Sequence, residues 1–229
     1  MTTGASVCFS GRSIIVNRLR GAGTEALNIG WGTGGGVTGA SNANVNMFQP
    51  ATEARTAGTS SGISTSFLAD TYKVTGSITA TAAKTITEVA LFDTTTLSPT
   101  TTLFASATAS ATSITLAAAI GPTTGNFYIE LGGLVTGGET VLVTGGQNTT
   151  LVTIVRGQLG SVSGIQTSGA SVTVGGDGGA NTSWAVGGQT ASVPASLGGN
   201  MFAHADFAGL ALNSGDSILF TVTDQFSGA

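Results

Sequence analysis

Residues 71–80 read TYKVTGSITA, and their regular alternation of side-chain types is the strongest fold signal in the chain. The positions that fall on one side of an extended chain are Tyr72, Val74, Gly76 and Ile78. The polar residues between them fall on the other side, and this period of two is typical of a β-strand with one buried face. A second candidate strand, 84–93, follows after a two-alanine link at 82–83. The short link predicts an antiparallel hairpin.

Further strands are predicted on both sides of this pair. The candidates before it are 26–32 and an irregular, Ser/Thr-rich stretch at 54–67. Towards the other end, 200–207 and 216–226 are joined through Asn-Ser-Gly-Asp at 213–216, which is a strong turn signal. These last two strands are therefore predicted to form another pair.

One short helix is predicted near the start of the chain, with Ser10 as its cap and Gly21 and Gly23 as its end. The residues with helical spacing between them are Ile14, Ile15, Arg18 and Leu19. The Gly- and Asn-rich stretch 34–46 is predicted to be a loop or a mobile arm.

Composition supports a β-rich fold. Charged residues make up 8% of the chain, against roughly 25% in an ordinary soluble domain. Small, β-branched and glycine residues predominate, and they suit pleated surfaces, turns and bulges better than exposed helical faces. We therefore expect an all-β protein with a sandwich or jelly-roll-like parent domain and one short N-terminal helix.

The middle of the chain, 98–198, has a different texture, richer in glycine and in runs of threonine. Its candidate strands are 113–116, 126–131, 139–144, 149–156 and 170–174. Their spacing predicts a small sandwich or barrel, with a hairpin turn at 145–148. Because insertions are tolerated at loop tips, we interpret this segment as a β module inserted into a discontinuous parent domain, 1–97 plus 199–229. Its Gly-rich end, 175–198, is interpreted as a return linker.

Charge and cysteine content exclude several classes of partner. The net charge is −4 and the seven basic residues are scattered, so nucleic acid is not an expected partner. No stretch resembles a secretory signal or a membrane helix, which predicts synthesis in a cytoplasm and no membrane partner. Weak surface charge opposes association poorly, so a homo-oligomer is expected. The single cysteine, Cys8, cannot form an intrachain disulfide and is expected to be buried.

The residues that could carry chemistry form no recognisable catalytic pattern. His204 is the single histidine, lies in a candidate strand, and is expected on a solvent- or subunit-facing surface. Glu130, Glu139, Asp93 and Asp206 could pair for glycoside cleavage, but nothing in their spacing requires it. Asp93 and Asp206 are instead expected to shape the junction with the inserted module. We therefore assign no catalytic, cofactor-binding or metal-ligating residue and expect a protein that is not an enzyme.

Two local interactions are predicted from charge and turn chemistry. Arg156 is the one basic residue of the middle segment, and it is expected to pair with Glu139 before Glu130, because an unpaired buried charge is costly. Asp216 is expected to hydrogen-bond within its own turn, beside Gly215 in a positive-φ conformation.

Glycine-rich stretches are not interpreted as ligand sites. The cluster at 30–36 precedes a polar loop and has no lysine before Lys73, which argues against a phosphate cradle. Asp177 stands alone among glycines, and one carboxylate is too few for calcium.

Several motifs together resemble a family of structural proteins of tailed phages. They read NIGWGTG at 28–34, DTYKVTG at 70–76, ITEVALFD at 86–93, NMFAHADF at 200–207 and LNSGDSILFT at 212–221. In the family, the Leu-Phe-Asp element runs almost directly into the Gly-Asn-Met element, whereas about a hundred residues separate them here. The middle segment resembles a second phage-associated β module, through GETVLVT at 138–144 and VRGQLG at 155–160.

The resemblance implies a place in a virion assembled in the host bacterial cytoplasm. The implied function is that of a capsid-decorating or cement protein that binds the major capsid protein or tail proteins. The protein is expected to form a homo-oligomer, with a trimer favoured by analogy with decoration and fibre proteins. The alternative is a tail, baseplate or fibre component that binds a receptor or glycan. For that alternative Trp184 is the aromatic residue to test, since Trp31 is expected in the core. A Thr-rich ice-binding protein is disfavoured because the threonine runs have no fixed period.

Overall fold

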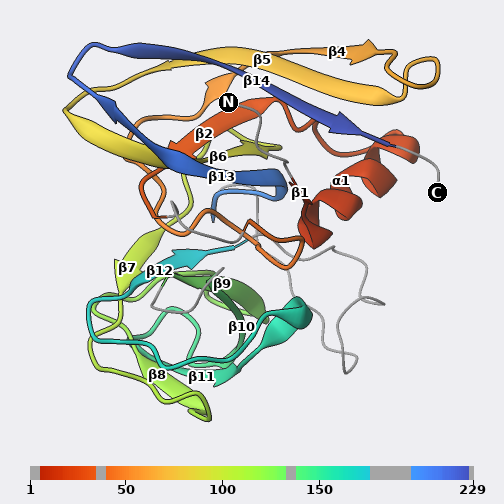
Figure 1. Cartoon of the computed structure of the whole chain (residues 1–229). Helices are drawn as coiled ribbons and strands as arrows, with labels where there is room; N and C mark the ends of the chain where they lie inside the picture. The colour runs from red at the N-terminus through yellow and green to blue at the C-terminus, as the bar shows by residue number, and fades with distance from the viewer. Residues whose placement is uncertain (1–5, 35–39, 133–137, 176–196, 227–229) are drawn as a thin grey trace.

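The computed structural model describes residues 6–34, 40–132, 138–175 and 197–226 as three stacked β layers (Figure 1). A three-stranded sheet lies uppermost, a five-stranded sheet lies beneath it, and a six-stranded sheet forms the lowest layer. All strand pairs are antiparallel, and the predicted all-β class with one short helix is confirmed.

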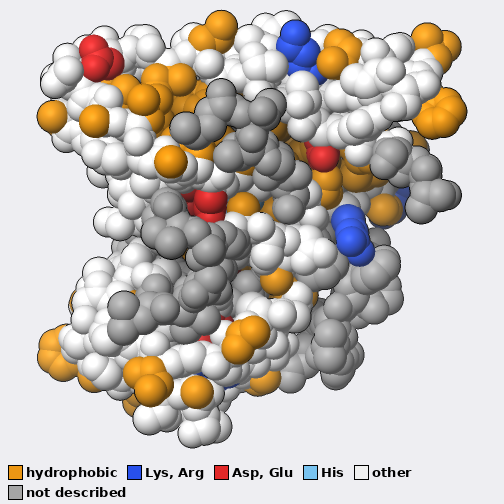
Figure 2. All heavy atoms as spheres, viewed as in Figure 1, with side chains coloured by type: hydrophobic (Ala, Val, Ile, Leu, Met, Phe, Trp, Pro, Cys, Tyr) orange, Lys and Arg blue, Asp and Glu red, His pale blue; other side chains and the backbone are white. Residues whose placement is uncertain are grey.

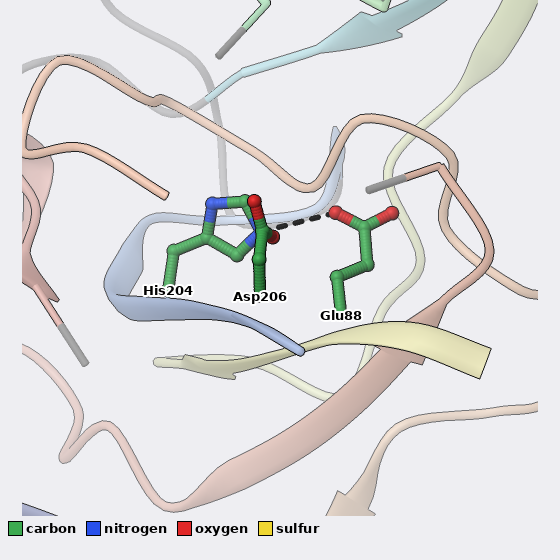
Figure 3. A group of neighbouring side chains, drawn as sticks. All are labelled: Glu88, His204 and Asp206. Atoms are coloured by element: carbon green, nitrogen blue, oxygen red, sulfur yellow. Dashed lines mark hydrogen bonds and ion pairs between the residues drawn. The ribbon is translucent and has the colours of Figure 1, made fainter. Parts of the chain in front are cut away.

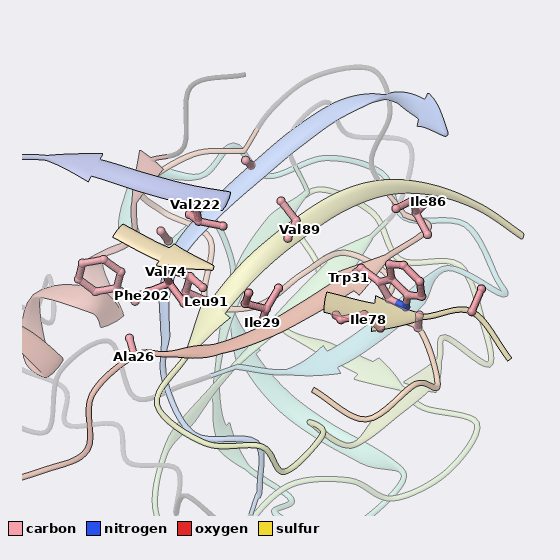
Figure 4. Packing of buried hydrophobic residues seen from close by; sticks show 14 of the residues in the cluster. Ala26, Ile29, Trp31, Val74, Ile78, Ile86, Val89, Leu91, Phe202 and Val222 are labelled. Atoms are coloured by element: carbon pink, nitrogen blue, oxygen red, sulfur yellow. The ribbon is translucent and has the colours of Figure 1, made fainter. Parts of the chain in front are cut away.

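The upper two layers form a sandwich around the main apolar core. The five-stranded sheet has the order β1-β13-β6-β2-β3, with bounds Ser6–Val7, Met201–Leu212, Lys84–Phe92, Asn28–Gly32 and Thr56–Ala57. The three-stranded sheet has the order β14-β5-β4, with bounds Ser217–Gln225, Thr71–Thr79 and Thr59–Ile63. Between the sheets, Trp31 meets Phe220 edge to face at 6.1 Å. Aliphatic side chains from both layers pack around Trp31 (Figure 4). The interior position predicted for Trp31 is confirmed.

The two predicted hairpins, 71–80 with 84–93 and 200–207 with 216–226, are wrong in their pairing, although their strands exist. β5 pairs with β14, and β6 pairs with β13, so each short connector crosses from one sheet to the other. The two connectors bond to each other: Ala80 N–H donates to the Asp216 carbonyl, and Gly215 N–H donates to the Ala80 carbonyl. The connectors carry the chain from one sheet of the sandwich to the other, so that apolar side chains of β5 and β6 face each other across the core.

The lowest layer is a small barrel. Its order is β7-β12-β9-β10-β11-β8, with bounds Thr100–Thr102, Ser171–Val174, Phe127–Gly132, Glu139–Gly145, Leu151–Val155 and Ser113–Thr115. A bridge between Leu103 and Leu116 joins the two outer strands and closes the sheet around its own apolar cluster. The predicted hairpin between β10 and β11 is confirmed, with Gly146 at φ 70° in its turn. A 3₁₀ turn, η1 (Gln158–Gly160), follows β11.

Within the described residues, the barrel strands pair among themselves and the sandwich strands pair among themselves. The chain leaves the sandwich after β6 and returns to it before β13. The division into folding units, 1–97 plus 199–229 and 98–198, stays a prediction.

The predicted helix is present as α1 (Phe9–Leu19), but its cap is wrong. Cys8 occupies the N-cap position, and Ser10 lies within the first turn, where its hydroxyl donates to the Met201 carbonyl at 2.6 Å. That bond fastens the helix to β13. Gly21 and Gly23 follow the helix at φ 73° and 71°, as expected for residues that end it.

Candidate functional site

The segment 40–50 lies between the sandwich and the barrel, and we call it the interlayer segment. Its residues 43–48 are all buried. Asn46 donates through Nδ2 to the Val174 carbonyl at 2.7 Å, and Ser171 of the barrel donates through Oγ to the Phe48 carbonyl at 2.8 Å. The mobile arm considered for 34–46 is therefore wrong for residues 40–46, which fill a joint between two β bodies.

Glycines on both bodies make room for this segment. A Cβ on Gly32 of β2 would lie 2.6 Å from the Gln49 carbonyl oxygen. On the barrel, a Cβ on Gly132 would lie 2.9 Å from the Phe48 carbonyl oxygen, and one on Gly138 would lie 2.5 Å from Glu130 Oε1. Gly32, which belongs to the glycine cluster at 30–36, thus lets the backbone of the interlayer segment approach β2 closely.

Glu88 anchors the interlayer segment to the sandwich. Its carboxylate points away from the main core and accepts N–H bonds from Gly34 at 3.1 Å, Phe48 at 2.9 Å and Gln49 at 2.9 Å. His204 Nε2 lies 3.0 Å from Glu88 Oε2. Burial acts to raise the pKa of Glu88, but His204 and the N–H donors outweigh it and hold the pKa below its ordinary value.

His204 is fully buried, so its expected position on an exposed or subunit-facing surface is wrong. Its ring meets Phe48 edge to face at 5.1 Å, and its Nδ1 lies 3.2 Å from Asn44 Oδ1. The face of β13 that carries His204 is covered by the interlayer segment, which strand periodicity alone does not reveal.

Asp206 completes a cluster with these two side chains (Figure 3). It stands directly opposite Glu88 in the β13–β6 ladder, and its Oδ1 lies 3.3 Å from His204 Nε2. Its Oδ2 accepts the N–H of Ala40 at 2.9 Å. Burial raises the pKa of Asp206 above its ordinary value.

Glu130 anchors the same segment to the barrel from the opposite side. It accepts bonds from Asn44 Nδ2 at 3.2 Å and from Val45 N–H at 3.3 Å. Burial nevertheless raises its pKa to about 8, so it is neutral at pH 7. The Thr140 hydroxyl donates to the Ala43 carbonyl at 2.7 Å, and Thr140 Oγ1 lies 3.2 Å from Glu130 Oε2. A proton on Glu130 can therefore donate to Thr140, and a neutral acid satisfies the site.

Arg55 holds together the two chain crossings between sandwich and barrel. Its guanidinium stacks on Phe92 at 3.3 Å and donates to the carbonyls of Gly198 at 2.6 Å and Thr94 at 3.3 Å. A further bond goes to Ser98 Oγ at 3.1 Å. Burial lowers its pKa to about 9, although the charge of Asp93 opposes that shift.

Asp93 lies where the chain leaves the sandwich and bonds the residue at which it returns, as expected for a junction residue. It accepts bonds from the backbone N–H of Asn200 at 2.8 Å and from Asn200 Nδ2 at 3.2 Å. Burial raises the pKa of Asp93 above its ordinary value, against these bonds. Asp206 instead lies beside Glu88, so the two aspartates act at different places.

The predicted Arg156–Glu139 pair is confirmed. Arg156 Nε donates to Glu139 Oε1 at 2.6 Å, and Arg156 Nη2 donates to the other carboxylate oxygen. Further bonds go from Arg156 to the carbonyls of Thr108 at 2.6 Å and Gly164 at 2.5 Å. Glu139 is fully buried, so this bidentate pair ties the loop 156–166 to the barrel wall.

The remaining predicted residues occupy structural positions or lie outside the described residues. Asp216 accepts the N–H of Asn213 at 2.7 Å, and Gly215 has φ 90°, which confirms the turn. Cys8 is buried as expected, and burial raises the pKa of its thiol above the ordinary range. Asp177 and Trp184 lie outside the described residues.

A groove of about 480 Å³ lies where the interlayer segment meets the barrel rim. Its lining residues are Gln49, Pro50, Thr100, Thr101, Thr102, Gly132, Gly169, Ala170 and Ser171. Hydroxyl groups and backbone dominate this lining, and no aromatic or charged side chain is among these residues. Among the residues that the structure describes, the groove therefore offers no stacking platform for a sugar.

Comparison with known proteins identifies no relative: no protein-family model, curated protein or solved structure matches the chain. Among the described residues, no helix is long and apolar enough to cross a membrane.

The sequence analysis missed three residues that define the joint: Glu88, Asn44 and Arg55. A signal existed for Glu88, because an acid in the middle of ITEVALFD at 86–93 conflicts with burial on both faces unless it has partners. Glycines at alternate positions in β2 were a second signal, since they indicate a strand face covered by backbone. Asn44 and Arg55 carried no local signal.

Proposed function

We propose that this chain is a structural component of a tailed-phage particle, and within that class a capsid-decorating protein that acts by docking to neighbouring subunits. Two lines support the proposal. The sequence motifs resemble phage structural proteins, and the structure presents a rigid apolar turn suited to anchoring. That turn is the observation that carries the proposal.

The turn joins β4 to β5 and displays two large apolar side chains. Phe67 is 68% exposed and Leu68 is 93% exposed. The Asp70 carboxylate holds the backbone beneath them by accepting N–H bonds from Thr65 and Ser66, both at 2.8 Å, and from Phe67 at 3.0 Å. A preorganised apolar anchor loses little conformational entropy on binding, which is the property of an interface hot spot.

The outer sheet offers further surface for subunit contact. Within the described residues, β4 and β14 each pair with β5 alone, so each has a free edge. An unpaired strand edge is a template for another chain. Figure 2 shows few charged side chains on the viewed face, with hydrophobic side chains at both ends of the upper layer and at the lower end of the barrel. Little charge repulsion opposes assembly through such a surface.

The test is a docking assay on particles of the phage that encodes the chain. Phe67 and Leu68 are replaced together by serine, and Phe104→Ser is the matched control, because Phe104 is 70% exposed on the barrel. We expect the double variant to keep the wild-type circular dichroism and melting temperature, and to lose about 30-fold in co-sedimentation with particles, as loss of a hot spot worth about 2 kcal/mol would require. The control should bind like the wild type.

Two results would count against the proposal. Absence of the chain from purified particles by mass spectrometry would remove the virion role. Unchanged co-sedimentation of the double variant would remove the anchoring turn. Cryo-electron microscopy of labelled particles separates a head position from the alternative, a tail, baseplate or fibre component.

A further inference from the structure

We propose that Glu88, His204 and Asp206 bind one divalent first-row transition-metal ion, with Zn²⁺ as the reference ion. The proposal is independent of the virion role, because it rests on the geometry and hydrogen bonding of the buried cluster alone. The ligand set would be one imidazole nitrogen and two carboxylate oxygens.

The three ligand atoms already have the spacing of a coordination sphere. His204 and Asp206 are two residues apart on one face of β13, and Glu88 stands opposite Asp206 on β6. Nε2 lies 3.0 Å from Glu88 Oε2 and 3.3 Å from Asp206 Oδ1, and the three atoms lie within 4.8 Å of one another (Figure 3). Ligands about 2.0–2.1 Å from a tetrahedral zinc ion are themselves about 3.3 Å apart. A register irregularity follows Asp206 in β13, and such bulges redirect side chains at functional sites.

The outer hydrogen bonds of His204 are those of a metal ligand. Ser41 N–H donates to Asn44 Oδ1 at 2.7 Å, and Asn44 Nδ2 donates to Glu130 at 3.2 Å, which together fix the orientation of the amide. Asn44 therefore presents its oxygen to His204 Nδ1, so Nδ1 carries a proton. In metal sites the second ring N–H of a ligating histidine is bonded in this way, and the other nitrogen is left for the ion.

Hydrogen bonds also orient the two carboxylates. Glu88 Oε1 accepts two backbone N–H bonds, from Gly34 and Gln49, and Oε2 accepts one, from Phe48. One acceptor position on Oε2 is then left toward the cluster. Asp206 Oδ2 accepts the N–H of Ala40. Asp206 Oδ1 accepts no hydrogen bond, and the side chain is only 10% exposed. Each residue therefore directs one remaining donor atom to a common point.

Charge balance favours a cation at that point. As a ligand set, two carboxylates and a neutral imidazole carry two negative charges in a buried cluster. A divalent ion bound to neutral His204 and both carboxylates brings the sum to zero. Imidazole favours zinc, copper, iron or nickel, while Mg²⁺ and Ca²⁺ prefer all-oxygen sites, so the proposal discriminates among ions.

The experiment uses the full chain after treatment with EDTA and dialysis. Isothermal titration with ZnCl₂ and elemental analysis should give one zinc per chain and a raised melting temperature, and MgCl₂ at the same concentration should give neither. Asp206→Asn keeps an oxygen for Ala40 N–H and should weaken zinc binding more than about 100-fold, beyond the 10–100-fold typical of lost outer partners. Asp216→Asn, in an exposed turn, is the matched control and should bind like the wild type.

A spectroscopic measurement on the unaltered protein covers the case in which Asp206→Asn fails to fold. Co²⁺ bound to one imidazole and two carboxylates should give visible d–d absorption that saturates at one equivalent and is displaced by Zn²⁺. No stoichiometric zinc and no cobalt spectrum would overturn the proposal. Equal zinc affinity in Asp206→Asn and the wild type would overturn this ligand set.

Discussion

Glu88 and Glu130 lie on opposite sides of the interlayer segment, are equally inaccessible to solvent, and have opposite protonation. Both side chains are fully buried. Glu88 has a lowered pKa, whereas the pKa of Glu130 is raised to about 8. Burial disfavours the anion at both sites, so the difference comes from their partners. Glu88 has His204 and three backbone N–H groups, while Glu130 has weaker, longer donors and no cation among its hydrogen-bond partners.

A buried acid can therefore hold such a joint together in two ways. An anion with a full set of donors orders the backbone around it, and its loss leaves those donors unsatisfied. A neutral acid acts as a hydroxyl donor and an acceptor, and an amide can replace it at little cost. The sandwich side of the joint uses the first way and the barrel side uses the second.

The largest expected effect is the contrast between Glu88→Gln and Glu130→Gln. Glu88→Gln removes the anion beside buried His204 and should lower the free energy of unfolding by about 3–5 kcal/mol. Glu130→Gln replaces a neutral acid and should lower it by about 1 kcal/mol or less at pH 6. Urea unfolding of both variants measures the difference. Equal losses of unfolding free energy in the two variants would contradict the proposed difference between Glu88 and Glu130.

Arg55→Met tests the buried cation at the same joint. Methionine keeps the apolar stem near Phe92, but the carbonyls of Thr94 and Gly198 lose their donor. We expect a loss of about 2–3 kcal/mol, smaller than for Glu88→Gln, because the hydrogen-bond partners of Arg55 are neutral and Asp93 interacts with it only through its charge. Urea midpoints measure it, and a loss above that of Glu88→Gln would contradict the ranking.

Gly32→Ala tests whether backbone proximity shapes the sandwich side. The added methyl would meet the Glu88 carboxylate and the Gln49 carbonyl, and we expect a loss of about 1–3 kcal/mol. Gly62→Ala in β4 is the matched control, since its methyl would make an ordinary contact at 3.8 Å. The control should change stability by less than about 0.5 kcal/mol. Thermal melts of the two variants suffice, and a tolerated Gly32→Ala would mean that the segment can move away.

The last expected effect is a pH slope that belongs to Glu130. Because the folded state keeps the Glu130 proton up to about pH 8 and the unfolded state releases it near pH 4.5, stability due to this group falls as pH rises between those values. Above pH 8 the loss is complete. Asp224, whose pKa burial raises to about 6, adds the same sign below that pH. The charge of Glu88 also faces Glu130 and contributes to its raised pKa.

Urea unfolding of the wild type and of Glu130→Gln at pH 5, 6.5 and 8 isolates that slope. We expect the wild type to lose stability relative to the variant at each step. Parallel curves would show that Glu130 ionises in the folded protein as it does in the unfolded chain.

Much of the secondary structure was predictable because strand burial leaves a local record. The alternation at 71–80 places Val74 and Ile78 inward, and both are buried. The Arg156–Glu139 pair followed from a shortage of partners in the middle segment. The joint was not predictable in the same way, since Asn44 and His204 are 160 positions apart and neither position has a local pattern that names the other.

The sequence predicted the β class, most of the strand positions, the turn at 213–216 and the charge pair of the barrel. These depend on periodicity, turn chemistry and charge scarcity, which act over a few residues. The tertiary structure alone decided that β5 joins β14, that β6 joins β13, and that the interlayer segment covers Glu88 and His204. Periodicity indicates which face of a strand is to be buried. The segment that buries this face comes from elsewhere in the chain, so long-range packing determines which segment it is.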